Sequence, residues 1–194
     1  MKKHFFVFRH GQTTYNVNGL IQGQTNDSVL TQKGVEQAYE IGLKLKQYPI
    51  EVMLCSPLKR TVQTANEVLK NCNKIPLIIE NDITEVNIGE IEGLHFSKVL
   101  ELYGSEYEKW RNINSTDLDY CFKGGETKRQ VRTRAFKLLN RYLYETDFTH
   151  IAVATHGILL AQICNELNFE VDEIKNGAIL HLFFDDGSWK IDFM

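Results

Sequence analysis

The chain has 194 residues, of which 43% are hydrophobic and 24% charged, and this composition predicts a folded domain with a sizeable core. A net charge of -3 excludes the usual signs of a nucleic-acid or membrane-surface partner, so any anion site must be built from a few placed arginines. The four cysteines are scattered without metal-site spacing, and no apolar run is long enough for a signal or a membrane span, so we expect a cytoplasmic protein.

The first predicted strand, residues 4–8 (HFFVF), leads directly into Arg9-His10-Gly11. Gly11 interrupts the strand and leaves Arg9 and His10 at its carboxyl end, where ligands bind in open α/β sheets. A guanidinium suits phosphate or carboxylate, and an imidazole can be a nucleophile or a general base. Taken alone, the tripeptide is equally compatible with an ordinary strand end.

A polar loop over residues 12–30 follows, and long loops inside compact domains are usually functional. Thr31 is the expected N-cap of a helix over about 32–47, in which apolar residues recur at helical spacing. A second strand is predicted over 51–56.

The next helix carries a cation to the same edge of the sheet. Ser56 and Pro57 are typical of a helix start, which predicts a helix over about 57–71 with Arg60 in its first turn. The positive end of the helix dipole opposes a guanidinium there, so we expect a compensating anion. The alternative is an arginine that points into solvent.

The middle of the chain is less regular. We expect a third strand over 76–80, an acidic loop over 81–93 that contains Glu85, and a partly helical cap over about 94–125. The cap is rich in aromatic residues and in charges, and it closes at a pair of glycines.

The last third of the chain repeats the opening arrangement. A helix over about 126–144 precedes a buried strand over 150–155, which ends at His156 and a glycine. A short helix and two strands joined by an Asp-Gly turn complete the predicted elements, over 158–167, 178–184 and 188–193. The arginines of the long helix are interpreted as a solvated flank: Arg129, Arg132 and Arg134.

Strands that alternate with helices predict an α/β sandwich with a largely parallel sheet. Arg9, His10, Arg60 and His156 then lie at one edge, where they repel one another unless they surround a dianion such as a phosphoryl group. The chain has no P-loop and no carboxylate set for a metal, so we expect neither metal nor cofactor. A neutral histidine would attack phosphorus, and Glu85 could protonate the leaving oxygen. Which histidine attacks stays open.

Seven segments in the same order resemble motifs of the histidine phosphatase superfamily, the phosphoglycerate-mutase-like proteins. They are RHGQTTYN (9–16), IQG (21–23), DSVLTQKG (27–34), SPLKRTVQTA (56–65), ITEVNIGEIEG (83–93), GGET (124–127) and THG (155–157). The resemblance covers most of the chain. It implies a three-layer α/β/α sandwich with a mixed sheet, formed by residues 1–194 as one domain with the cap as an insertion.

The resemblance also assigns roles. His10 would be the phosphorylated nucleophile, and Glu85 the proton donor and acceptor. The phosphoryl oxygens would be held by two arginines and the second histidine, and a loop would contribute three more residues. These substrate-binding residues are Arg9, Arg60 and His156, with Asn16, Gln22 and Gly23 from the loop.

Two features favour the phosphatase branch, acting on a small phosphorylated metabolite. Residues 86–89 replace the Arg-His-Tyr-Gly run of the glycolytic mutases, and the cap has no arginine pair. A cofactor-dependent phosphoglycerate mutase is the alternative, and a non-catalytic phospho-ligand binder is a second one. Ile91 and Val29 depart from common family residues, Trp and Pro, at positions that affect packing more than chemistry.

Overall fold

The computed structural model describes residues 2–72 and 74–194. Within them a six-stranded sheet runs in the order β3-β2-β4-β1-β5-β6. Neighbouring strands are parallel from β3 to β1, and the pairs β1–β5 and β5–β6 are antiparallel. The strands are β1 (Lys3–Arg9), β2 (Val52–Cys55), β3 (Leu77–Ile79), β4 (His150–Thr155), β5 (Ile179–Asp185) and β6 (Ser188–Phe193).

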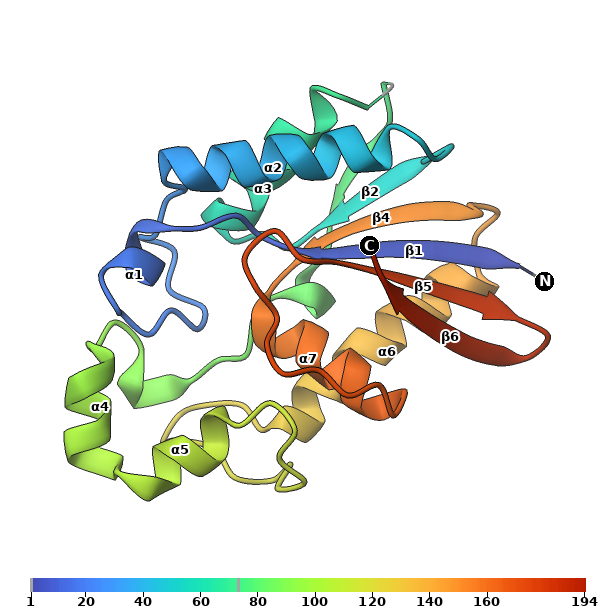
Figure 1. The fold of residues 1–194 in the computed structure, drawn as a ribbon. Helices are drawn as coiled ribbons and strands as arrows, with labels where there is room; N and C mark the ends of the chain where they lie inside the picture. The colour runs from blue at the N-terminus through green and yellow to red at the C-terminus, as the bar shows by residue number, and fades with distance from the viewer. Residues whose placement is uncertain (1, 73) are drawn as a thin grey trace.

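Helices cover both faces of this sheet, with α2 and α3 on one side and α6 and α7 on the other (Figure 1). The alternation of β1 serves both layers: Phe5 and Val7 belong to the core under α6 and α7, and Phe6 and Phe8 to the core under α2 and α3. The expected three-layer α/β/α sandwich with a mixed, mostly parallel sheet is therefore confirmed. These helices are α2 (Gln32–Leu45), α3 (Lys59–Leu69), α6 (Lys128–Tyr144) and α7 (Gly157–Glu166).

The remaining helices lie beyond the carboxyl ends of the parallel strands (Figure 1). They are α1 (Thr14–Val17), α4 (Phe96–Tyr103) and α5 (Ser105–Arg111), with short 3₁₀ turns η1 (Asn81–Ile83) and η2 (Gly89–Ile91) between β3 and α4. We call residues 94–125, which contain α4 and α5, the cap segment.

The start of α3 differs from the prediction. The helix begins at Lys59, with Leu58 as an N-cap that makes no side-chain capping bond. Ser56 lies before this N-cap, where its Oγ accepts the backbone N–H of Leu58 at 3.4 Å and lies 2.7 Å from Nε2 of His156. The predicted hairpin at the C-terminus is confirmed, with Asp186 and Gly187 at positive φ in the turn between β5 and β6.

Two glycines let the loop after β1 lie against the start of α2. A Cβ atom on Gly11 would lie 2.2 Å from the carbonyl oxygen of Gly34, and one on Gly34 would lie 2.1 Å from that of Gln12. The backbone N–H of Gly11 also donates to Oγ1 of Thr64 on α3, at 3.1 Å. The position of His10 is therefore set from β1, α2 and α3 together.

Within residues 2–72 and 74–194, the helices include none whose length and apolar character would suffice to cross a membrane.

Candidate active site

A cavity of about 760 Å³ opens at the carboxyl ends of the parallel strands. All the predicted site residues line it except His156, which lies fully buried directly beside His10. The predicted residues in its wall are Arg9, His10, Asn16, Gln22, Gly23, Arg60 and Glu85. The parallel strands bring these distant segments together, since their ends meet at one edge of the sheet.

His10 is held in one tautomer. Its Nδ1 lies 2.8 Å from the carbonyl oxygen of Gly11, which can only accept, so Nδ1 carries the proton and Nε2 keeps its lone pair. Burial, followed by the charges of Arg9 and Arg60, lowers the pKa of His10 well below its ordinary value. The imidazole is therefore neutral at physiological pH and presents an unprotonated nitrogen.

His156 stands next to His10, with 5.3 Å between the ring centroids and 62° between the planes. Its Nε2 lies 2.7 Å from Oγ of Ser56 and 3.1 Å from Oγ1 of Thr61, and both hydroxyls can donate to it. Burial and the nearby Arg60 lower its pKa well below the ordinary value, so this ring is neutral too. Hydroxyl donation to Nε2 places the proton on Nδ1, which has no partner in the described part of the chain.

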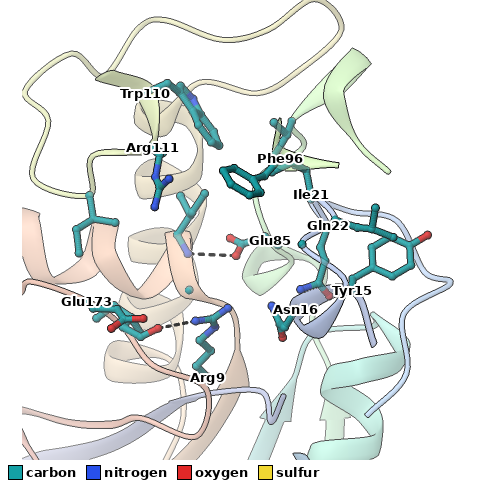
Figure 2. A pocket seen from close by; sticks show the side chains of 18 of the residues that line it. Arg9, Tyr15, Asn16, Ile21, Gln22, Glu85, Phe96, Trp110, Arg111 and Glu173 are labelled. Carbon is teal, nitrogen blue, oxygen red and sulfur yellow. Dashed lines mark hydrogen bonds between the residues drawn. The ribbon is translucent and has the colours of Figure 1, made fainter. Parts of the chain in front are cut away.

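Both arginines of the site are anchored by backbone carbonyls. Nη1 of Arg9 donates to the carbonyl of Ile174 at 2.6 Å (dashed in Figure 2). Arg60 donates from Nη1 to Thr25 at 2.9 Å and from Nη2 to Gly23 at 2.7 Å. Burial lowers the pKa of Arg60 to about 10, so it remains charged at neutral pH. Arg60 therefore does not point into solvent.

Three buried donors at this edge of the sheet lack a partner among the described residues: Nε of Arg9, Nε of Arg60 and Nδ1 of His156. Buried polar groups are normally hydrogen-bonded, and an unpaired one costs about 1–3 kcal/mol. Their N–H groups and the two guanidinium charges fit a tetrahedral dianion beside His10.

Glu85 reaches the cavity from the segment after η1, and its carboxylate lies at the N-terminus of α7 (Figure 2). Oε2 accepts the backbone N–H of Ile158 at 3.1 Å, and Oε1 accepts those of Leu159 at 3.2 Å and Val86 at 3.0 Å. Free N–H groups and the positive end of the helix dipole stabilise a carboxylate there. Glu85 can therefore remain in place as a carboxylate after it has given up a proton.

The predicted loop residues form a hydrogen-bonded wall. Oδ1 of Asn16 accepts from the backbone N–H of Thr13 at 3.0 Å and from Nδ2 of Asn176 at 3.2 Å. Oε1 of Gln22 accepts from the hydroxyl of Thr13 at 3.1 Å. The oxygens of both amides are thus engaged, and their NH₂ groups remain as donors for a ligand. The carbonyl of Gly23 accepts from Arg60, which gives this loop a second role as its anchor.

The interpretation of Arg129, Arg132 and Arg134 as a solvated flank is wrong for two of the three. The side chain of Arg129 is 60% exposed, whereas those of Arg132 and Arg134 are 19% and 16% exposed. Arg132 binds Glu166 on α7, and Arg134 binds the segment that carries Glu85. Helical periodicity could not reveal this, because both partners are distant in sequence.

Two further residues support the site without having been predicted. Ser56 contacts His156, and its place directly before Pro57 had suggested a helix cap. Asn176 donates to the carbonyl of His10 at 3.1 Å from a loop whose sequence carries no recognisable signal for this contact.

The far side of the cavity is formed by the cap segment and the loop after β1. Figure 2 shows Phe96, Trp110 and Arg111 above the cavity and Tyr15 beside it, with the Arg111 guanidinium directed inward. Glu173 lies on the side of Arg9. Within residues 2–72 and 74–194, no group of three or more His, Cys, Asp or Glu side chains could hold a metal ion.

The fold is an α/β/α sandwich, and two histidines and two arginines meet at the carboxyl ends of its strands. Proteins of this class can bind an anion beside a neutral imidazole. Residues 5–194 match the family model described as histidine phosphatase superfamily (branch 1), so the chain belongs to that superfamily.

Two curated relatives of this chain carry different names. Phosphoglycerate mutase-like protein 4 of Arabidopsis thaliana is 28% identical over 190 residues, which cover 95% of this chain and 81% of that protein. The 2-carboxy-D-arabinitol-1-phosphatase of Triticum aestivum is 30% identical over 173 residues, which cover 89% of this chain and 34% of that protein. The relatives are thus phosphatases and mutase-like proteins.

Solved structures with the same fold include Bacillus stearothermophilus YhfR. It matches with a TM-score of 0.88 at 21% identity over 98% of this chain and 96% of that chain. The mycobacterial glucosyl-3-phosphoglycerate phosphatase, in a complex with VO3, matches with a TM-score of 0.84 at 21% identity over 98% and 97% of the two chains. At these identities the likeness concerns the fold.

Proposed function

We propose that the protein is a metal-independent phosphomonoesterase that acts on a small phosphorylated metabolite through a phosphohistidine at His10. The observation that carries this proposal is the set of unpaired donors on Arg9, Arg60 and His156 next to the free Nε2 of His10. Such a site can bind a phosphoryl group and neutralise its charge without a metal ion. Residues 94–125 would act as a cap over the leaving group.

In the first step, Nε2 of His10 attacks phosphorus in line with the leaving oxygen. The N–P bond forms while the P–O bond breaks, and the leaving alkoxide takes a proton from Glu85. The N–H groups at the start of α7 then stabilise the resulting carboxylate. The hydrogen bond from Nδ1 to Gly11 stabilises the positive charge that develops on the ring.

In the second step, the Glu85 carboxylate takes a proton from water, and the oxygen of that water attacks phosphorus. The P–N bond breaks, inorganic phosphate leaves, and His10 returns to its neutral form. Glu85 ends the cycle protonated and ready for the next substrate.

Hydrolysis is favoured over phosphoryl transfer to a second hydroxyl by the residues around the leaving group. In the sequence directly after Glu85, Val86 and Ile88 are buried apolar residues, so no cationic side chain follows the acid. Of the Lys and Arg residues in the cap segment, all of which the structure describes, Arg111 is the one that lines the cavity. The wheat relative named as a phosphatase supports the same choice, and the mutase-like relative keeps a mutase as the second candidate.

The test follows phosphate release and isomer formation together, with EDTA present. The substrates are a panel of phosphomonoesters and 3-phosphoglycerate with a trace of 2,3-bisphosphoglycerate. We expect phosphate release that survives EDTA, a phosphorylated protein after rapid quenching, and a loss of about a thousandfold or more in His10→Ala.

Formation of 2-phosphoglycerate with little phosphate release would identify a mutase instead. Phosphate that binds without turnover of any substrate would identify a non-catalytic binder. Release that stops with EDTA would contradict metal independence.

A further inference from the structure

Arg134 lies on α6, outside the cavity, yet its guanidinium binds the backbone of the segment that ends at the proposed acid, Glu85. Nη1 donates to the carbonyls of Asp82 at 2.9 Å and Thr84 at 2.5 Å, and Nη2 donates to that of Glu85 at 3.0 Å. Three carbonyls of one short segment thus converge on one side chain. The planar fork of an arginine can make these bonds together, and a lysine ammonium cannot reproduce them.

The same guanidinium is held in place by Glu126. Nε of Arg134 donates to Oε1 of Glu126 at 2.7 Å, and Nη2 donates to Oε2 at 2.9 Å. The two side chains are 16% and 18% exposed, so the pair is partly removed from water and is worth more than a surface ion pair.

Glu126 also binds the chain on the other side of Glu85. Its backbone N–H donates to the carbonyl of Asn87 at 2.7 Å, and its Oε2 accepts the N–H of Asn87 at 3.3 Å. The Arg134–Glu126 pair therefore binds the backbone of the acid-bearing segment at two places, through Arg134 at residues 82–85 and through Glu126 at residue 87. Glu85 sits between these two attachments.

We propose that Arg134, together with Glu126, is a positioning residue that fixes Glu85 for proton transfer without touching the substrate. The backbone of Glu85 is attached to α6 through Arg134, and its carboxylate is attached to the N-terminus of α7. Both attachments are needed, because a displacement of about 1 Å can cost roughly a hundredfold in rate. The inference rests on the proposed function of Glu85 as acid and base.

The experiment compares substrates that differ in their need for a proton. The leaving alkoxide of glycerol phosphate needs an acid, whereas p-nitrophenolate leaves almost without one. In Arg134→Lys we expect kcat/KM to fall about a hundredfold for glycerol phosphate and only a few-fold for p-nitrophenyl phosphate. With the latter substrate, slow hydrolysis of the phosphoenzyme should produce a burst of nitrophenolate and a lowered kcat.

Arg132→Lys is the matched control. Arg132 lies on the same helix, has a similar exposed fraction and binds Glu166 and Gln162, and among the described residues it forms no hydrogen bond or ion pair with the acid-bearing segment. Loss of packing alone would affect both variants and both substrates alike. Glu85→Gln serves as the benchmark for complete loss of the acid, and Glu126→Gln repeats the test in case Arg134→Lys does not fold.

Leaving-group selectivity in Arg134→Lys or Glu126→Gln, absent from Arg132→Lys, supports the positioning role. If Glu85→Gln is selective and the Arg134 and Glu126 variants are not, the positioning role is overturned and the proposed function stands. If the wild-type protein hydrolyses neither substrate, or Glu85→Gln is not selective, the proposed function fails and the positioning role fails with it.

Discussion

At the scale of single residues, the site works through hydrogen bonds that decide which nitrogen carries a proton. His10 donates from Nδ1 to a carbonyl, which leaves the lone pair of Nε2 available for the proposed attack. Nε2 of His156 lies beside the hydroxyl groups of Ser56 and Thr61, which can donate to it. The proton of this ring is then on Nδ1, where it is available to the proposed ligand. The neighbours of the two histidines thus make one ring present an unprotonated nitrogen and the other an N–H group.

Ser56 should therefore matter for anion binding. Ser56→Ala removes the 2.7 Å contact with Nε2 of His156 and leaves the longer 3.1 Å contact of Thr61, so the proton is directed to Nδ1 less strongly. We expect weaker inhibition by vanadate, with an increase in its inhibition constant of about tenfold, which corresponds to roughly 1.4 kcal/mol. Ser28→Ala is a suitable control, because Ser28 is equally buried and its hydroxyl has no hydrogen-bond partner among the described residues. Equal vanadate inhibition in the two variants would refute this role of Ser56.

At the scale of elements, close backbone contacts place the residues that strands and helices carry. The loop after β1 lies against the N-terminus of α2 at a distance that leaves no room for a side chain. Because the contact involves backbone on both sides, neither partner can rotate out of the way.

A methyl group at this contact should displace His10, the proposed nucleophile. Gly34→Ala places a Cβ 2.1 Å from the carbonyl oxygen of Gln12, two residues from His10. We expect a loss of about 1–3 kcal/mol in unfolding free energy and a lower kcat in the molecules that remain folded. Urea unfolding and phosphatase assays on Gly34→Ala and on Lys33→Ala, an exposed neighbour, would measure both effects. Wild-type stability and kcat in Gly34→Ala would show that the loop can move away at no cost.

At the scale of the whole molecule, neutral histidines lie at both ends of the sheet. His10 and His156 occupy the carboxyl end. His4 and His181 lie 2.9 Å apart, Nδ1 to Nε2, toward the other end of β1. Burial is the largest cause that lowers the pKa of each of the four. Protonation of these rings therefore destabilises the folded state.

The sign of the resulting pH dependence follows from the unfolded chain. Below about pH 6.5 an unfolded histidine binds a proton that the folded ring excludes, so stability is present above this pH and falls below it. For the fully buried His10 and His156, the slope approaches about 1.4 kcal/mol per pH unit for each ring. His4 and His181 are partly solvated and should contribute less.

Urea unfolding between about pH 7.5 and about pH 5.5 measures this slope. His156→Gln should flatten it, because this variant lacks one of the two fully buried rings. A free energy of unfolding that is constant over this range would contradict the prediction.

Local sequence patterns were enough to predict the sheet and the residues at its edge. Alternating strands and helices require parallel neighbours, and parallel strands end at one edge, so Arg9, His10, Arg60 and His156 could be placed together from local patterns alone. The Asp-Gly turn predicted the final hairpin for a similarly local reason, since few residues adopt its positive φ angles. The resemblance to the superfamily, now confirmed by the family model, selected His10 and Glu85 for their roles, and those roles await their tests.

The contacts that hold the site residues in place became visible in the folded structure alone. The contacts of Ser56 with His156, of Asn176 with His10 and of Arg134 with Glu85 join residues that lie from 49 to 166 positions apart. No periodicity encodes such pairs, because each depends on where two elements meet after packing. For that reason a half-buried arginine on α6 looked like a solvated one, and a serine that contacts a histidine looked like a helix cap.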